Sequence, residues 1–147
     1  NPLIKTILEE KKTAKILTPH PKEFASLLKI LRNKTHSTEA ILANKFDLAR
    51  EFSLDYPEAL LILKGTNTLI AQRGTVYIAS MGTPALAKGG SGDVLAGMLA
   101  ALVGQGYGLK EAAISAVIAH SLAARNYSGA NYAFTPIKLI EGLGTLA

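Results

Sequence analysis

The stretch Lys88-Gly89-Gly90-Ser91-Gly92-Asp93-Val94-Leu95-Ala96-Gly97 decides the interpretation of this sequence. Its closely spaced glycines let the backbone adopt positive φ and bring N–H groups close to a ligand. An apolar helix is predicted immediately afterwards, from about Gly92 to Gly104. The first N–H groups of a helix lack internal partners, and the helix dipole is positive at that end. The loop is therefore suited to bind phosphate.

Asp93 adds a feature that a simple phosphate cradle does not need. A carboxylate in the first helical turn repels a bound phosphate unless it has a task of its own, such as accepting the proton of an attacking hydroxyl. The alternative is that Ser91 or Asp93 merely caps a helix that follows a flexible turn. The loop is not a Walker A motif, because no Gly-Lys-Ser/Thr follows its glycines, and it is not G-x-G-x-x-G after a strand.

Short apolar runs alternate with helical periodicity along the rest of the chain. This alternation predicts an α/β fold with helices covering a sheet, in one domain over residues 1–147 or in part of a larger one. Strands are expected at Ala14–Thr18 and Ala59–Leu63, with a hairpin of Thr68–Ala71 and Thr75–Ala79. Helices are expected at Pro2–Lys12, at Pro21–Leu31, at Leu109–Tyr127 and after Pro136. A further helical stretch is opened by Ser37 and is expected to bury Ile41, Leu42, Phe46, Leu48, Ala49 and Phe52 on one side.

Composition narrows the class of protein. The chain has 147 residues, 48% of them hydrophobic and 18% charged, so disorder is not expected. It lacks cysteine, which excludes disulfides and thiolate chemistry and suits a cytoplasmic protein. No apolar run is long enough to span a bilayer, so no membrane partner is expected. The net charge of +5 fits either a generally basic protein or attraction of anionic substrates. The basic residues are scattered along the chain, which argues against nucleic-acid binding.

The segment Gly89–Gly97 resembles the signature of the ADP-dependent NAD(P)H-hydrate dehydratases, a branch of the ribokinase-like superfamily. Three further segments resemble the same family, in the same order along the chain. They are Leu17–Glu23 (LTPHPKE), Leu63–Thr68 (LKGTNT) and Thr83–Ala87 (TPALA). The resemblance implies a ribokinase-like layered α/β/α sheet, with this chain as the C-terminal portion of a larger domain.

The resemblance also implies a reaction. Family members repair NADH or NADPH that has gained a hydroxyl on the nicotinamide ring. Phosphorylation of that hydroxyl by ADP, or by ATP in eukaryotic members, converts it into phosphate, whose departure restores the ring. Mg²⁺ is expected as a cofactor bound mainly through the nucleotide phosphates. No protein-bound metal site is expected, because the three histidines are far apart in sequence.

Residue roles follow from the same resemblance. Asp93 is the expected general base toward the substrate hydroxyl, and His20 the expected contact to the dinucleotide substrate. The adenine nucleotide is expected to bind Lys64, Gly65, Thr66, Asn67 and Thr68, together with Gly89, Gly90, Ser91 and Gly92 of the glycine loop. His36 and His120 have no such support, and His120, on an apolar helix, is interpreted as structural.

Two positions depart from the family pattern. Lys22 stands where glycine is common and Thr83 where asparagine is common, which leaves substrate contacts at those loops open. A small-molecule kinase of the same superfamily and a nucleotide-binding fragment without turnover remain alternatives. A small-residue face at Ala112–Ala123 allows tight packing or a homo-oligomer, and an NAD(P)HX epimerase domain is fused upstream in some relatives.

Overall fold

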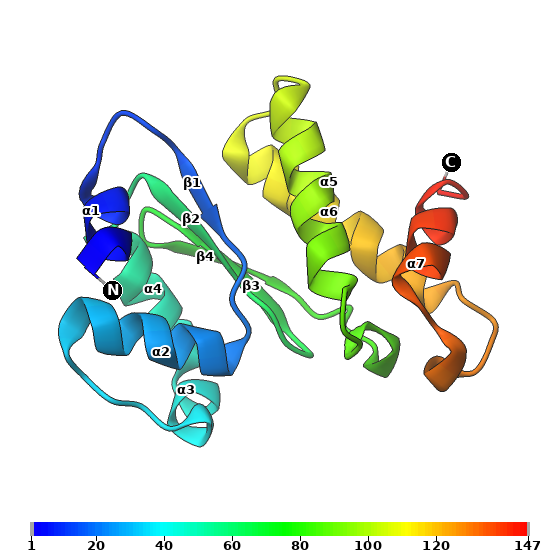
Figure 1. The fold of residues 1–147 in the computed structure, drawn as a ribbon, viewed down its shortest axis with the longest axis horizontal. Helices are drawn as coiled ribbons and strands as arrows, with labels where there is room; N and C mark the ends of the chain where they lie inside the picture. The colour runs from blue at the N-terminus through cyan, green and yellow to red at the C-terminus, as the bar shows by residue number, and fades with distance from the viewer. Residues whose placement is uncertain (1, 147) are drawn as a thin grey trace. The chain divides into compact units, whose positions relative to one another are not determined.

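The computed structural model describes residues 2–146, which contain one β-sheet together with helices from both ends of the chain (Figure 1). Asn1 and Ala147, the ends of the predicted domain, lie outside these residues. By Cα proximity the chain divides into two units. One contains the residues up to Gly65 together with Leu69–Ile78, and the other contains Thr66–Thr68 and the residues from Ala79 onward. The α/β fold predicted from the alternation is confirmed.

A four-stranded sheet in the order β1-β2-β3-β4 organises the first unit. Its strands are β1 (Lys15–Leu17), β2 (Ala59–Leu63), β3 (Thr68–Gln72) and β4 (Thr75–Ala79). β1 and β2 are parallel, with Ile16 opposite Leu60, whereas β2 and β3 are antiparallel, with Ile62 opposite Ile70. Every residue of β2 is buried, which is the pattern of a central strand covered on both faces.

Four helices belong to the first unit: α1 (Pro2–Glu9), α2 (Pro21–Arg32), α3 (Thr38–Ala43) and α4 (Lys45–Asp55). The last three form the crossover that joins the parallel strands β1 and β2. Their apolar side chains form one core with alternate residues of the sheet. This core contains Phe24, Leu28, Ile41, Phe52, Ala59, Leu61, Leu63, Leu69 and Ala71.

The stretch opened by Ser37 differs from the prediction in part. Ile41, Leu48, Ala49 and Phe52 are buried as expected, but Leu42 and Phe46 remain 51% and 44% exposed. The physical reason is a break at Asn44, whose φ of −120° and ψ of 20° are not helical. The break gives α3 and α4 separate buried faces, so a single helical periodicity cannot run through both.

The hairpin between β3 and β4 turns at Arg73 and Gly74, which have φ of 50° and 78°. A two-residue turn with positive φ at both positions matches the twist of the strands it joins. A Cβ at Gly74 would also lie 2.8 Å from a methyl carbon of Leu54, and its N–H donates to the buried hydroxyl of Ser53 at 2.9 Å.

The second unit is mostly helical. It contains the 3₁₀ turns η1 (Pro84–Leu86) and η2 (Asn131–Ala133), and the helices α5 (Ser91–Gly104), α6 (Leu109–Arg125) and α7 (Pro136–Leu143). Small residues of α6 are buried, which lets neighbouring helices approach closely. The core of this unit contains Ala85, Ala123, Ala124, Phe134 and Leu139. Across residues 2–146, no helix has the length and hydropathy needed to cross a bilayer.

Candidate functional site

The glycine loop begins α5 without a capping side chain. Gly90 is the residue before the helix, with φ of 86° and ψ of −15°, and no side chain caps the helix start. The capping alternative for Ser91 and Asp93 is therefore wrong. Gly90 is required twice over: its φ is positive, and a Cβ at this position would lie 2.7 Å from Cγ of Pro136 at the start of α7.

Ser91 ties the loop to the turn before it. Its hydroxyl lies 2.7 Å from the carbonyl oxygen of Leu86 and 2.9 Å from that of Lys88, and it donates to them. The Ser91 N–H also donates to the Lys88 carbonyl oxygen at 3.3 Å. The loop is therefore a folded turn attached to η1, and its backbone is held in place before any ligand arrives.

Several N–H groups of the loop remain available to a ligand. The N–H groups of Asp93 and Val94 both donate to the carbonyl oxygen of Gly90, at 3.1 and 3.2 Å. By contrast, no atom of residues 2–146 accepts a hydrogen bond from the N–H of Gly89, Gly90 or Gly92. Gly89 is exposed, and the other two glycines are partly exposed. Free N–H groups at the positive end of a helix dipole form an anion site.

The Asp93 side chain is exposed in the first turn of α5. Within residues 2–146 it forms no hydrogen bond or ion pair with another side chain. Its carboxylate is thus available beside the anion site, as the general-base interpretation requires. The second unit brings together Asp93 and the loop residues Gly89, Gly90, Ser91 and Gly92 in one continuous turn of chain.

His20 and Lys64 lie near each other in the first unit, just after the parallel strands β1 and β2. The Lys64 N–H donates to the carbonyl oxygen of Pro19 at 2.9 Å, and Lys64 Nζ lies 3.9 Å from Oε2 of Glu23. The carboxyl ends of parallel strands are where ligands bind in open α/β sheets. Two predicted segments that are far apart in sequence, Leu17–Glu23 and Leu63–Thr68, therefore meet at this edge.

His20 also has a structural task that the sequence interpretation missed. Its Nδ1 accepts the N–H of Glu23 at 3.1 Å, while its own N–H donates to Oε2 of Glu23 at 2.7 Å. This reciprocal pair is a capping box at the start of α2. The three-residue spacing of His20 and Glu23 at the start of an apolar helix was a signal for this capping box. It was missed because histidine is an unusual capping residue. The imidazole Nε2 lies 3.4 Å from Oε1 of Glu23, and the side chain is 48% exposed.

The loop between β2 and β3 contains the other predicted nucleotide-binding residues. Gly65, Thr66 and Asn67 form the loop, and Thr68 is the first residue of β3. The N–H of Gly82 donates to the carbonyl oxygen of Thr66 at 3.2 Å, within the second unit. Gly82 was not predicted as a site residue, although it directly precedes the segment Thr83–Ala87.

His120 supports the glycine loop from behind. It is 7% exposed on α6, and its Nε2 lies 2.9 Å from the carbonyl oxygen of Ser91. The sequence interpretation of a structural histidine did not identify this contact, because Ser91 and His120 are separated by most of two helices. A histidine among the apolar residues Ala116, Val117, Ala119 and Ala123 of this helix was the signal for a specific partner.

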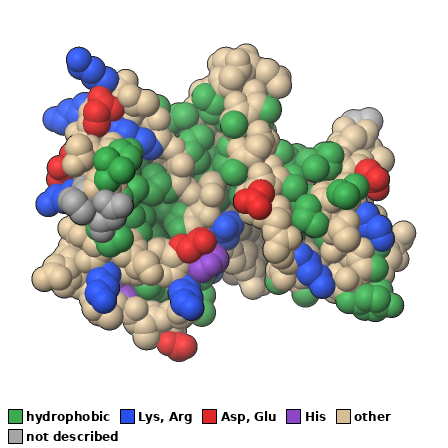
Figure 2. All heavy atoms as spheres, in the orientation of Figure 1, with side chains coloured by type: hydrophobic (Ala, Val, Ile, Leu, Met, Phe, Trp, Pro, Cys, Tyr) green, Lys and Arg blue, Asp and Glu red, His purple; other side chains and the backbone are tan. Residues whose placement is uncertain are grey.

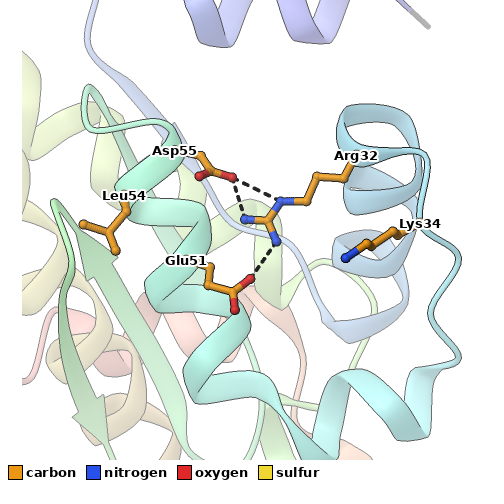
Figure 3. A pocket seen from close by; sticks show the side chains of 5 residues that line it. All are labelled: Arg32, Lys34, Glu51, Leu54 and Asp55. Carbon is orange, nitrogen blue, oxygen red and sulfur yellow. Dashed lines mark hydrogen bonds and ion pairs between the residues drawn. The ribbon is translucent and has the colours of Figure 1, made fainter.

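A second polar cluster is structural in character. A hollow of about 470 Å³ is lined by Arg32, Lys34, Glu51, Leu54 and Asp55 (Figure 3). The Arg32 guanidinium donates to Asp55 at 2.6 and 3.1 Å and to Glu51 at 2.9 Å. Partial burial opposes the charge of Arg32, but these hydrogen bonds raise the pKa of its guanidinium. Because two carboxylates already engage this cation, it ties α2 to α4 rather than binding an anion.

Basic side chains and possible metal-ligating side chains are not clustered. Figure 2 shows Lys and Arg side chains scattered over the visible face instead of gathered in one patch. Within residues 2–146, no three His, Asp or Glu side chains are grouped in a way that could hold a metal ion.

The chain is similar to proteins of one family over nearly all of its length. Residues 3–143 match the family model described as NAD(P)H-hydrate dehydratase. The chain is 49% identical over 142 residues to the bifunctional NAD(P)H-hydrate repair enzyme of Helicobacter pylori, covering 97% of this chain and 30% of that protein. It is 36% identical over 126 residues to the ADP-dependent (S)-NAD(P)H-hydrate dehydratase of Staphylococcus aureus, covering 86% of this chain and 42% of that protein.

A solved structure gives the same result. The ADP/ATP-dependent NAD(P)H-hydrate dehydratase of Bacillus subtilis, co-crystallised with ATP and Mg²⁺, is similar with a TM-score of 0.80 and 27% identity. The similarity covers 92% of this chain and 47% of that one. This chain thus spans less than half the length of each of these three proteins. Since the family match extends over nearly all of its residues, the chain belongs to the NAD(P)H-hydrate dehydratase family and has its ribokinase-like α/β fold.

Proposed function

We propose that this chain provides the nucleotide-binding and phosphoryl-transfer part of an enzyme that dehydrates hydrated NADH or NADPH, using ADP or ATP. One observation carries the proposal. The N–H groups of Gly89, Gly90 and Gly92, from which no atom of residues 2–146 accepts a hydrogen bond, are followed directly in the chain by Asp93, whose carboxylate no other side chain in those residues engages. An anion site alone needs no adjacent carboxylate, whereas transfer of phosphate to a hydroxyl needs both.

The first step is phosphoryl transfer. The Asp93 carboxylate accepts the proton of the ring hydroxyl as the hydroxyl oxygen forms a bond to the terminal phosphorus of the nucleotide. The bond from that phosphorus to the bridging oxygen breaks, and AMP leaves from ADP, or ADP leaves from ATP. The N–H groups of the glycine loop donate to the transferring phosphoryl oxygens, where their fixed orientation stabilises the developing charge.

The second step is elimination. The carbon–oxygen bond of the phosphorylated ring breaks, and inorganic phosphate leaves with the electron pair. The neighbouring ring carbon loses a proton to water, and the electron pair of that C–H bond forms the carbon–carbon double bond of the dihydronicotinamide. The overall change is loss of water from the hydrate, driven by hydrolysis of one phosphoanhydride bond. Phosphate is a much better leaving group than hydroxide, which is why the first step is needed.

The remaining predicted residues hold the two substrates. We assign Lys64, Gly65, Thr66, Asn67 and Thr68 to the adenine nucleotide, together with Gly89–Gly92, and His20 to the dinucleotide. The position of Lys64 at the carboxyl end of β2 supports this assignment. Mg²⁺ would arrive with the nucleotide and neutralise charge on its phosphate oxygens. Co-crystallisation of the B. subtilis dehydratase with ATP and Mg²⁺ supports that expectation.

The proposal also includes a fused domain and a cellular location. An NAD(P)HX epimerase domain in the same polypeptide is supported by the word "bifunctional" in the name of the H. pylori relative. A cytoplasmic location is supported by the lack of cysteine, since disulfide-free chains suit reducing compartments. The small residues Ala112, Ala113 and Ala116 are fully buried in the single chain, so packing within the chain accounts for them without a second copy.

The test is an absorbance assay on the complete natural protein that contains this sequence. Hydrated NADH, Mg²⁺ and either ADP or ATP are mixed with the protein, and recovery of the NADH absorbance band is followed. We expect recovery with at least one nucleotide, accompanied by equal amounts of phosphate and of AMP or ADP. Nucleotide consumption only with other alcohols would replace the proposal with a small-molecule kinase. Nucleotide binding without any turnover would replace it with a binding module.

A further inference from the structure

His120 makes one specific polar contact that the proposed reaction does not yet use. The side chain is buried on α6, and its Nε2 lies 2.9 Å from the carbonyl oxygen of Ser91. A carbonyl oxygen only accepts hydrogen bonds, so Nε2 must carry the proton and donate it. The contact therefore fixes both the position of the oxygen and the protonation of this ring nitrogen.

The Ser91 carbonyl and the Gly92 N–H belong to the same peptide group. A trans peptide group is planar, so its oxygen and its N–H point in opposite directions. Holding the Ser91 oxygen from behind the loop thus directs the Gly92 N–H away from α6. The Gly92 N–H is one of the donors to which no atom of residues 2–146 is hydrogen-bonded. In a regular helix the same oxygen also accepts the N–H four residues later, so His120 adds a second donor.

A second donor has an electronic effect as well as a geometric one. Hydrogen bonds in a chain polarise one another, and a polarised peptide group has a stronger N–H donor. The loop is held on two other sides, by the Ser91 hydroxyl bonded to Leu86 and by Pro136 packed against Gly90. Unlike these two contacts, the hydrogen bond from His120 acts directly on the peptide group that contains the Gly92 N–H.

We propose that His120 is a positioning residue, which orients the Gly92 N–H toward the transferring phosphoryl group by donating to the Ser91 carbonyl oxygen. This inference rests on the proposed function of the glycine loop. It assigns His120 no contact with substrate or nucleotide. Its effect is on the binding and transfer of phosphate, not on binding of the nicotinamide substrate.

Three variants of the complete natural protein test the inference. His120→Leu removes the donor, and His120→Gln keeps an N–H group at a similar reach. Val117→Ala is the matched control, because Val117 is also buried on the same helix, at 3% exposure, and its side chain has no hydrogen-bond donor. Loss of one oriented hydrogen bond should weaken ADP binding about tenfold and lower kcat by a similar factor. The KM for the hydrate should not change, and His120→Gln should recover most of the loss.

Two direct measurements separate this inference from the proposed function. Nitrogen NMR of the His120 imidazole should report a proton on Nε2, and calorimetry of ADP binding needs no turnover. If the natural protein fails to regenerate NADH but binds ADP, the proposed function fails while the variant series still decides the role of His120. Equal ADP affinity in wild type and His120→Leu would overturn the inference. An equal loss in Val117→Ala, an absence of ADP binding in the wild type, or a proton on Nδ1 alone would also overturn it.

Discussion

The N–H of Gly82 donates to the carbonyl oxygen of Thr66 at 3.2 Å, and a Cβ at Gly82 would lie only 2.4 Å from that oxygen. The backbone of the segment before η1 and the loop after β2 are therefore in direct contact, with no room for a side chain. Any side chain at Gly82 must displace one of the two segments, and one of them contains Thr66, which is proposed to bind the nucleotide.

Gly82→Ala is accordingly expected to weaken ADP binding by about tenfold or more, and to lower the free energy of unfolding by about 1–3 kcal/mol through overpacking. Calorimetry and thermal unfolding measure the two effects. Gly104→Ala is the matched control: a Cβ there meets nothing within 4 Å, and alanine favours a helix over glycine by up to about 1 kcal/mol. Wild-type ADP affinity in Gly82→Ala would remove the Thr66 loop from the nucleotide site.

Asp93→Asn should lower kcat by about 10²- to 10⁴-fold, because asparagine cannot accept the hydroxyl proton. ADP binding should be retained, since the substitution removes a negative charge from beside the phosphate. Asp47→Asn provides the control, because Asp47 is an exposed aspartate in the first turn of α4. Unchanged turnover in Asp93→Asn would exclude the general-base role, whereas a comparable loss in Asp47→Asn would point to a general effect of charge.

Two substitutions of His20 separate its capping role from substrate binding. His20→Ala removes the acceptor for the Glu23 N–H and should destabilise the protein by about 1 kcal/mol. His20→Ser keeps a good capping oxygen and should retain nearly all of the stability. Both variants should raise the KM for the hydrate by roughly tenfold, the equivalent of one hydrogen bond. A normal KM in His20→Ser would leave His20 with only its capping role.

Glu39 links stability to acid pH. A hydrogen bond from its own backbone N–H, and then one from the Ser37 hydroxyl, lower the pKa of this carboxyl below its ordinary value of 4.5. A lowered folded-state pKa gives stability that is present above 4.5 and lost as the pH falls through the folded value. The melting temperature of wild type should therefore exceed that of Glu39→Gln at neutral pH, and the difference should shrink below this range. A difference that stays constant into acid would contradict the assignment.

Much of the fold could be predicted because local chemistry marks it. Pro19 and Pro21 end β1 and begin α2, and Gly74 permits the turn between β3 and β4. The break at Asn44 could not be predicted, because asparagine is tolerated within helices and only tertiary packing chose two short helices there. The residues of the candidate site also divide into those with a local sequence signal and those whose contacts depend on tertiary packing. The loop at Gly89–Gly92 is a local signal, whereas the contact of His120 with Ser91 depends on how α5 and α6 pack.

The chain passes between its two compact units three times, before Thr66, after Thr68 and before Ala79. A single cut, whether by a protease or at the level of the gene, cannot therefore release either unit whole. A fragment ending at Ile78 would keep Thr66–Thr68 but lose Gly82, and a fragment starting at Ala79 would keep Gly82 but lose Thr66. The hydrogen bond between Gly82 and Thr66 therefore forms only in a chain that contains both segments, and a cut between Ile78 and Ala79 separates its two partners.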